Sequence, residues 1–277
     1  MSPCTIRILA PDGLHDADYT ADSLAEAVRY EPADGVYTLT NTYNTFQTLK
    51  LDAHLDRLED SARRENIPLR LDRGALRAGL RRMITEAGYG DVRFRITAGR
   101  QSPDRLILSI EPFAPLPSEL IARGIHCMTM PNAARRNPAA KSSGWLHTRA
   151  QIRGSLPDGI YEGLLLSPDG YILEGLSSNF YAILAGQLRT ADTGILFGIS
   201  RQIVLAVAPD VLSVNLTAVN VAELPNVSEA FITSSSRGIV PVVEIDGSAV
   251  GRGEPGEMTM ALRRVYNDWI VAHLETL

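Results

Sequence analysis

The sequence predicts an α+β fold in two domains, with antiparallel sheet in both. Strand-like and helix-like segments are mixed along the 277 residues, without the regular alternation that a doubly wound parallel sheet requires. Three closely spaced prolines, Pro112, Pro115 and Pro117, indicate a linker between the two halves. We therefore expect a small N-terminal domain over residues 1–113, a linker over 114–122 and a larger C-terminal domain over 123–277.

The first half contains the local signals of a helical hairpin packed on strands. Leu55 and Leu58 have the spacing of one buried helix face, and Gly88 is placed to end a second helix. Alternating β-rich residues follow a turn-like Pro-Ala-Asp-Gly segment. The expected elements are a strand over 36–42, helices over 52–65 and 73–87, and paired strands over 92–98 and 105–110.

The second half begins with a strand and a loop that leads to Lys141. A Ser-Pro-Asp-Gly turn at 167–170 joins two strand-like segments and predicts a hairpin. The expected strands are 125–130, 162–166, 171–174, 179–184, 187–190, 231–233 and 239–245. The expected helices are 146–153, 199–208 and 254 to the C-terminus.

The composition excludes several classes of function. The net charge of −5 argues against nucleic acid as the main partner, because phosphate contacts require a basic face. The two cysteines, Cys4 and Cys127, have no metal-binding or disulfide spacing, which favours a reducing cytoplasm. No segment reaches the roughly 18 consecutive apolar residues of a membrane-spanning helix, and the N-terminus lacks a signal pattern. We expect a cytoplasmic protein with no membrane partner and no metal.

Lys141 and Glu174 are the first candidates for chemistry. Lys141 is one of only two lysines and lies among small residues that leave room for a ring beside its amine. Such an amine can form an imine with an aldehyde, although a solvated surface lysine is the alternative. Glu174 ends an expected strand and could contact a pyridine nitrogen, or it could be an exposed hairpin acid.

Two segments and one arginine are candidates for binding phosphate. Ile199 and Ser200 follow a glycine at an expected helix start, where backbone N–H groups bind anions, although a plain serine cap is the alternative. Ser235 and Ser236 follow an expected strand and offer a second set of donors, or form a simple loop. Arg57 lies on an expected helix and could bind phosphate or form a surface ion pair.

Arg93 and Arg95 alternate along one expected strand, so their side chains point to the same face. Two arginines that face the interior require anions or acidic partners. They are therefore candidates for a substrate carboxylate, unless they pair with acids or face solvent.

In combination, these segments resemble the class IV aminotransferases, which are pyridoxal-phosphate enzymes of fold type IV. This family includes branched-chain, D-amino acid and R-selective amine transaminases and aminodeoxychorismate lyase. The resemblance covers nearly the whole chain. It rests on the segments Asp34–Tyr37, His54–Leu58, Lys141, Glu174-Gly175, Asn179-Phe180, Gly198–Arg201, Pro241-Val242 and Gly253–Thr259.

The resemblance implies a role for each matching residue. Lys141 would form the aldimine with pyridoxal 5'-phosphate and move the proton between the substrate Cα and the cofactor carbon C4′, and Glu174 would hold the pyridine nitrogen. Tyr37 would line the substrate pocket. The family is dimeric with shared active sites, and the loop that reaches the neighbouring subunit would lie near Arg29. The phosphate would be bound by Arg57, Ile199, Ser200, Ser235 and Ser236.

The chain departs from each subgroup of that family. Thr38 replaces an acidic residue, Ser102–Arg105 replaces an Arg-x-His carboxylate site, and Arg93 replaces the aromatic residue of a Tyr-x-Arg strand. We expect a transaminase that moves the amino group of an α-amino acid donor, favoured as a D-amino acid, to an α-keto acid. The alternatives are an aminodeoxychorismate-type lyase, a branched-chain L-amino acid or R-amine transaminase, and a cofactor-binding or regulatory protein without catalysis.

Overall fold

The computed structural model describes residues 4–131, 133 and 135–277, which group into two compact units. Unit 1 comprises the chain up to Ala114, together with Ala140–Gln151 and His273–Leu277. Unit 2 comprises Pro115–Ala139 and Ile152–Ala272. Both units combine helices with sheets that are antiparallel in most of their pairings, and the expected α+β class is confirmed.

The two units are not continuous in sequence, unlike the expected domains. The segment around Lys141 belongs to unit 1 because Ser142 forms a β-bridge with Val36 and the Lys141 carbonyl accepts from the Tyr37 N–H at 3.0 Å. Residues expected to form a linker fold instead into α4 (Ser118–Arg123), which contacts a strand of unit 2.

Unit 1 is built on one seven-stranded sheet of order β16-β4-β3-β5-β6-β1-β2, with every pairing antiparallel. The two N-terminal strands were not expected, and their place is fixed by pairing of β1 with the distant β6. The strands are β1 (Thr5–Ala10), β2 (Gly13–Asp16), β3 (Val36–Tyr43), β4 (Gln47–Leu49), β5 (Val92–Ala98), β6 (Leu106–Pro112) and β16 (Leu274–Thr276).

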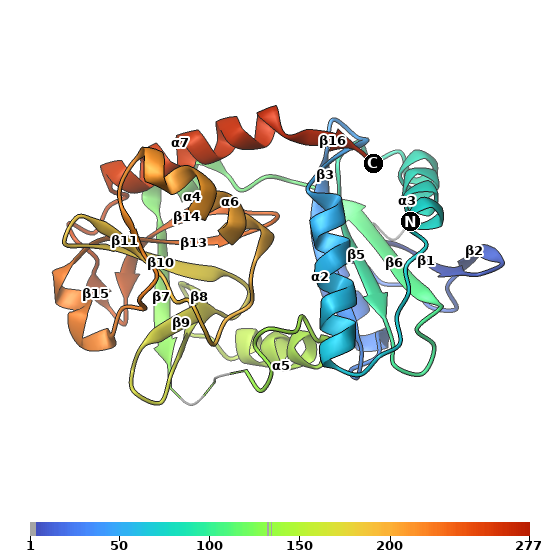
Figure 1. Ribbon diagram of the computed structural model, residues 1–277, viewed down its shortest axis with the longest axis horizontal. Coiled ribbons are helices and arrows are strands. Elements are labelled where there is room, and N and C mark those ends of the chain that lie inside the picture. The colour runs from blue at the N-terminus through green and yellow to red at the C-terminus, as the bar shows by residue number, and fades with distance from the viewer. Residues whose placement is uncertain (1–3, 132, 134) are drawn as a thin grey trace. The chain divides into compact units, whose positions relative to one another are not determined.

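Helices α2 (Leu51–Arg64) and α3 (Arg73–Ala87) pack on this sheet and enclose the core of unit 1 (Figure 1). The α3 helix begins where Asp72 accepts from the Ala75 N–H at 2.9 Å and ends at Gly88, whose φ is +65°. Both expected helices are confirmed, to within a residue at each end. A short helix α1 (Leu24–Ala27) and a 3₁₀ turn (Val28–Tyr30) precede β3.

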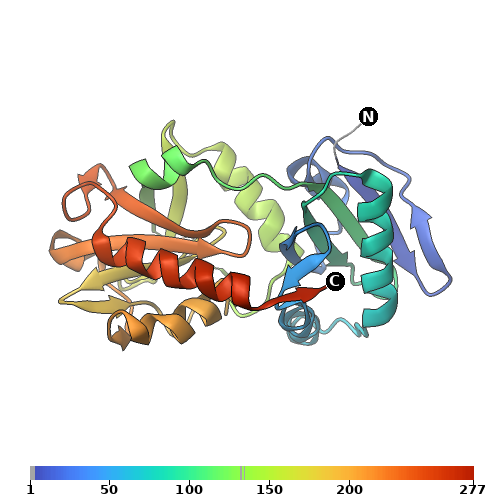
Figure 2. The ribbon, with the colours of Figure 1, turned by 90° about the horizontal axis from the view of Figure 1, so that it is seen from above.

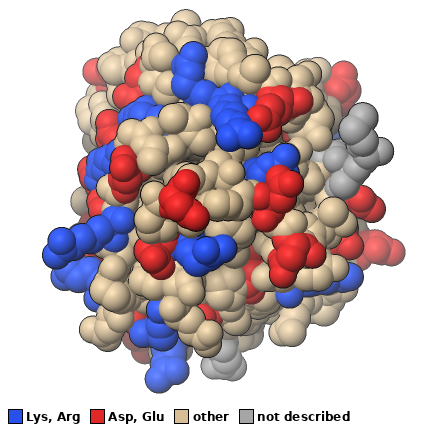
Figure 3. All heavy atoms as spheres, turned by 90° about the vertical axis from the view of Figure 1, so that its right-hand side faces the viewer, with Lys and Arg blue, Asp and Glu red and all other residues tan. Residues whose placement is uncertain are grey.

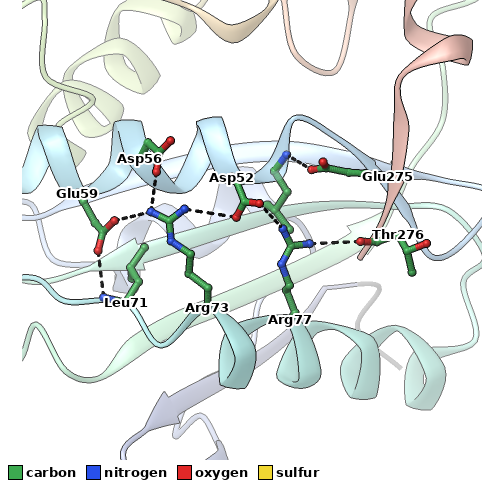
Figure 4. Close-up of polar contacts among 9 residues, drawn as sticks. Asp52, Asp56, Glu59, Leu71, Arg73, Arg77, Glu275 and Thr276 are labelled. Carbon is green, nitrogen blue, oxygen red and sulfur yellow. Dashed lines mark hydrogen bonds and ion pairs between the residues drawn. The ribbon is translucent and has the colours of Figure 1, made fainter.

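A polar network on the outside of unit 1 joins α2, α3 and the C-terminal strand (Figure 4). Arg73 of α3 contacts three carboxylates along α2, which are Asp52, Asp56 and Glu59. Arg77, one turn further along α3, pairs with Asp52 at 3.1 Å and donates to a carbonyl of β16 at 3.3 Å. The chain end, which we expected to continue as a helix, is therefore a strand held at the edge of the sheet; that expectation was wrong.

Unit 2 contains a nine-stranded sheet in which six strands form a closed path, because β9 pairs with both β8 and β10. A closed sheet has no free edges along that path. The strands are β7 (Ile125–Met130), β8 (Ile160–Leu166), β9 (Ile172–Gly175), β10 (Asn179–Leu184), β11 (Gln187–Arg189), β12 (Val214–Asn215), β13 (Val227–Ser234), β14 (Gly238–Ile245) and β15 (Ser248–Ala249).

Helices α6 (Ile199–Val207) and α7 (Glu257–Ala272) pack against each other and against β13, and Figure 2 shows α7 running along the strands of unit 2. The expected helix at 146–153 is α5 (Ser143–Gly154), most of which belongs to unit 1. Two 3₁₀ turns, Ala208–Asp210 and Val221–Asn226, complete the helices.

The charged side chains do not form a field of one sign on the face drawn in Figure 3, where Lys and Arg are interspersed with Asp and Glu. Among the described residues, no helix is long and apolar enough to cross a membrane. The same part of the chain contains no cluster of three or more His, Cys, Asp or Glu side chains that could hold a metal ion.

Candidate functional site

Lys141 is held at both ends of its peptide by unit 1. Its N–H donates to the Ser61 hydroxyl of α2 at 3.0 Å, and its carbonyl accepts from the Tyr37 N–H of β3 at 3.0 Å. The neighbouring Ser143 hydroxyl accepts from the Gly35 N–H at 2.8 Å. Gly35 must be a glycine because an added Cβ would lie 2.3 Å from the Ala98 carbonyl oxygen. The backbone below the Lys141 side chain is therefore fixed.

Tyr37 brings two cations together. The Lys141 Nζ lies 4.6 Å from the centroid of the Tyr37 ring, and the guanidinium carbon of Arg149 lies 5.7 Å from the same centroid. The Tyr37 side chain is buried, so it forms a rigid wall beside the amine. Sequence reasoning missed Arg149 of α5, because only the fold places it beside a residue more than 100 positions earlier.

Arg57 lies on α2 with two polar neighbours. Its Nη2 donates to the Thr38 hydroxyl at 3.4 Å and to Nδ1 of His54 at 3.5 Å, while the Thr38 Oγ1 lies 2.9 Å from the same Nδ1. Burial, and then the positive charges of Arg57 and Lys141, lower the pKa of His54 well below its usual value of 6.5. A neutral His54 can accept from Arg57 and leaves the charge of the guanidinium intact.

Arg93 and Arg95 both pair with acids, which is one of the alternatives that the sequence leaves open. Arg95 is 2% exposed, and its Nε donates to Glu31 at 2.9 Å while its Nη1 donates to the Leu24 carbonyl at 2.8 Å. Arg93 forms an ion pair with Glu111 on the adjacent strand. Arg29 is exposed in the 3₁₀ turn.

Glu174 and Asn179 face each other where the sheet of unit 2 closes. They are register partners of β9 and β10, so their side chains lie on the same face. The Leu196 N–H donates to Glu174 Oε2 at 2.9 Å, and Asn179 Nδ2 donates to the Leu196 carbonyl at 2.9 Å. Both side chains therefore hold the backbone that leads into α6. Arg135 donates to the other oxygen of Glu174 at 3.0 Å.

The start of α6 packs directly on this pair. At Gly198 an added Cβ would lie 2.3 Å from Asn179 Oδ1, so only glycine allows the approach. No side chain caps the helix, and the first N–H groups of any helix have no partner within it. Ser200 is buried, and its hydroxyl accepts from Tyr266 of α7 at 3.0 Å, which leaves its own proton for a ligand. Ile199 and Ser200 thus lie at a helix start of the general kind that can bind anions.

The serine-rich turn between β13 and β14 contains Ser235 and Ser236, both half-buried. Arg237, which the sequence did not single out, anchors it. Its Nε donates to Ser234 at 2.8 Å, its Nη2 donates to the Ser177 carbonyl at 2.9 Å, and its Nη1 donates to Glu162 at 3.1 Å. The turn is therefore fixed to the segment that follows Glu174.

Comparison with known proteins decides the family. A model of class IV amino-transferases matches residues 35–245, which is most of the chain. The chain belongs to the class IV aminotransferases. The family match includes Lys141, Glu174 and the start of α6, and the chain is a pyridoxal-phosphate-dependent aminotransferase that acts on an amino donor and a keto acid.

Individual relatives cover nearly the whole aminotransferase chain. It is 30% identical over 258 residues to a putative branched-chain-amino-acid aminotransferase of Methanocaldococcus jannaschii, covering 85% of this chain and 86% of the relative. It is 28% identical over 256 residues to a D-alanine aminotransferase of Bacillus licheniformis, covering 88% and 90%. These relatives include enzymes named for different substrates, so the family does not fix the substrate of this chain.

The fold agrees with a solved structure of the same class. A fold IV transaminase from Curtobacterium pusillum has a TM-score of 0.77 with this aminotransferase. The two are 22% identical, and the match covers 97% of this chain and 99% of the other. This likeness confirms the expected fold type IV.

The described residues include side chains of the types that pyridoxal 5'-phosphate chemistry requires. The cofactor requires a primary amine for its aldehyde, an acid for its ring nitrogen and donors for its phosphate. Unit 1 holds the amine of Lys141 on a fixed backbone, with the guanidinium of Arg57 on the adjacent helix. Unit 2 holds a buried carboxylate, Glu174, beside the start of α6.

Proposed function

We propose that this aminotransferase moves the amino group of an α-amino acid to an α-keto acid, with Lys141 as the catalytic residue. The observation that supports this assignment most directly is the fixed backbone of Lys141, held by Ser61 and Tyr37, with the amine 4.6 Å from the Tyr37 ring. A fixed base is required because the same group must remove a proton from the substrate Cα and deliver it to the cofactor carbon C4′. A surface lysine would have no such support.

Each remaining side chain has a proposed part in binding. Bound pyridoxal phosphate supplies an aldehyde that takes up the amine and a ring that accepts the electron pair of the Cα–H bond. Lys141 would remove the proton from the substrate Cα and deliver it to C4′ of the cofactor, and Glu174 would bind the ring nitrogen. Tyr37 forms a wall of the substrate pocket. The phosphate is bound by Arg57, the N–H groups of Ile199 and Ser200, and the turn that contains Ser235 and Ser236.

The proposed substrate is an amino acid with its carboxylate near Arg149. The support for this placement is that the Arg149 guanidinium lies against the same Tyr37 ring as the Lys141 amine. Arg93 and Arg95 form ion pairs with Glu111 and Glu31. A D-amino acid is favoured by the segment Asp34–Tyr37 and supported by the D-alanine aminotransferases among the relatives. Relatives named for branched-chain amino acids make the L-amino acid the alternative.

The experiment is a visible spectrum of the purified protein with bound cofactor, recorded as D-alanine, L-leucine, D-glutamate and an R-amine are added singly. We expect one D-amino acid to convert the bound cofactor to pyridoxamine phosphate, with release of its keto acid. Lys141→Ala should abolish the conversion. Lys50→Ala is the matched control, because Lys50 is the one other lysine of the sequence and precedes α2.

Each outcome of this experiment has a meaning. Conversion by L-leucine alone would contradict the proposed handedness. Release of pyruvate from aminodeoxychorismate without an amino acceptor would identify the lyase instead. Conversion that persists at the wild-type rate in Lys141→Ala would remove the assigned role of the lysine.

We also propose a cytoplasmic homodimer in which Arg29 reaches the active site of the second copy. Its support is the exposure of Arg29 beside Tyr30, which is 50% exposed and stacks on Tyr19 at 4.7 Å. The test mixes Lys141→Ala with Arg29→Ala subunits after dissociation. Mixed dimers should regain activity, because one of their sites combines an intact Lys141 with an intact Arg29; no recovery would contradict shared sites.

A further inference from the structure

Arg135 forms a buried ion pair with Glu174 in unit 2. The two side chains are each 5% exposed, and Arg135 Nη1 donates to Glu174 Oε1 at 3.0 Å. The second oxygen of the carboxylate accepts from the Leu196 N–H at 2.9 Å. Each oxygen of this carboxylate therefore already has a donor within the protein itself.

A pair of this kind has a chemical consequence for Glu174. Removing two charges from water is costly, and the cost is offset only when each charge has a close partner of opposite sign. A positive charge next to a carboxyl group favours its ionised form. The Leu196 N–H acts in the same direction, since a backbone donor stabilises the charged carboxylate. Glu174 is thereby fixed in orientation and held as an anion.

A carboxylate and a pyridine nitrogen in contact share one proton, and its position depends on which group is the stronger base. Arg135 touches the carboxylate directly, whereas the ring nitrogen would contact the carboxylate through a further hydrogen bond. The positive charge therefore weakens the carboxylate as a base more than it weakens the ring nitrogen. The proton then stays on the nitrogen. Arginine cannot supply a proton of its own, because its guanidinium remains charged in proteins.

We infer that Arg135 is a positioning residue that keeps Glu174 ionised, so that the shared proton stays on the ring nitrogen of the cofactor. This inference rests on the proposed function of Glu174. A protonated ring accepts electrons from the substrate carbon better than a neutral one. Arg135 thus acts on the reaction through Glu174 without touching the substrate.

The test is the ¹⁵N NMR resonance of ring-labelled pyridoxal phosphate bound to the intact protein. In the wild type we expect the resonance of a protonated ring. In Arg135→Gln it should move toward the position of unprotonated pyridine, and the rate of the half-reaction should fall about 10-fold to 100-fold, as when other outer groups that orient a functional ligand are lost. Arg135→Lys keeps the charge and should keep the resonance of the protonated ring.

Arg189→Gln is the matched control. Arg189 belongs to the same unit, donates to the carbonyls of Thr217 at 2.8 Å and Ala218 at 2.8 Å, and has its ion pair with Glu223 at 3.7 Å. Its replacement should leave the ring resonance unchanged. A shift in this variant as large as that in Arg135→Gln would overturn the inference, because general loosening of the unit would then explain both.

The failure of the inference can be told apart from failure of the proposed function. A wild-type protein that binds no pyridoxal phosphate, or a Glu174→Gln variant with an unchanged ring resonance, refutes the assignment of Glu174. An unprotonated ring in the wild type, an unchanged resonance in Arg135→Gln, or an unprotonated ring in Arg135→Lys overturns the role of Arg135 alone. The wild-type and lysine measurements decide the matter even if the glutamine variant does not fold.

Discussion

Arg95 should be a stabilising residue rather than a substrate-binding one, and Arg95→Met is the perturbation that decides this. Its guanidinium lies in the interior with Glu31, whose side chain is 0% exposed. Glu31 also accepts from the Thr97 hydroxyl at 2.7 Å. Removing the Arg95 guanidinium leaves the buried Glu31 carboxylate with the Thr97 hydroxyl as the one remaining side-chain donor among these contacts.

The expected cost follows from that geometry. Breaking one partner of a buried ion pair typically destabilises a protein by about 3–5 kcal/mol. For chains of about this size each kcal/mol lowers the melting temperature by about 2–4 °C, so the loss should be about 6–20 °C. Replacing both partners, as in Arg95→Met with Glu31→Met, removes the uncompensated charge and should recover most of the loss.

The assay combines thermal unfolding with steady-state turnover measured well below the melting temperature. We expect Arg95→Met to lose stability while the folded, cofactor-loaded enzyme keeps kcat/KM for amino acids and for amines. A variant that keeps the wild-type melting temperature and loses turnover of amino acids alone would refute this reasoning. It would return Arg95 to the role of a substrate-carboxylate site.

Two further predictions concern Gly198 and His54. Gly198→Ala places a Cβ 2.3 Å from Asn179 Oδ1, so it should cost about 1–3 kcal/mol of stability and weaken cofactor binding. Gly154→Ala is the control, because Gly154 has open space around it and its replacement should have neither effect. Equal melting temperatures and equal cofactor affinities for the two variants would contradict this prediction. Because the folded-state pKa of His54 is lowered, the unfolded chain binds a proton there below about pH 6.5 and the folded chain does not. The free energy of unfolding should therefore fall as the pH is lowered below 6.5, and His54 should contribute up to about 1.4 kcal/mol per pH unit to this fall. Unfolding curves measured at each pH should show that His54→Asn lacks this contribution. Parallel pH profiles for the two proteins would show that His54 is protonated in the fold.

The elements that sequence predicted well are those with local end signals. The α3 helix begins after Asp72 and ends at Gly88, and a cap and a left-handed glycine are both readable from the chain. The first strand, β1, has no such signal, and its position depends on pairing with β6 about 100 residues later. The segment at Lys141 belongs to unit 1 for the same reason, since its contacts with Val36, Tyr37 and Ser61 are all with residues about 80 or more positions earlier.

The residues of the candidate site also differ in whether the sequence alone reveals them. Residue types that chemistry requires, such as the amine of Lys141 and the carboxylate of Glu174, are visible in the sequence with their flanking motifs. Residues that act through a neighbour are not, because Arg135 and Arg149 become informative only when the fold places them beside Glu174 and Tyr37. Arg95 was visible in the sequence but its role was not, because its position on the strand was compatible with binding either a substrate carboxylate or an acidic side chain. Its hydrogen bond to Glu31 in the fold shows that its partner is an acidic side chain.

Thr38 illustrates how a departure from the family pattern can be explained by charge. An acid in its place would be fully buried beside the guanidinium of Arg57, and the two would form an ion pair. Such a pair would cancel the charge that Arg57 can offer to a phosphate group. The threonine hydroxyl accepts from Arg57 at 3.4 Å and lies 2.9 Å from neutral His54, so neither of these contacts places a negative charge beside Arg57. We infer that Thr38 bears on phosphate binding rather than on the choice between transamination and elimination, because its contacts are with the arginine and the histidine.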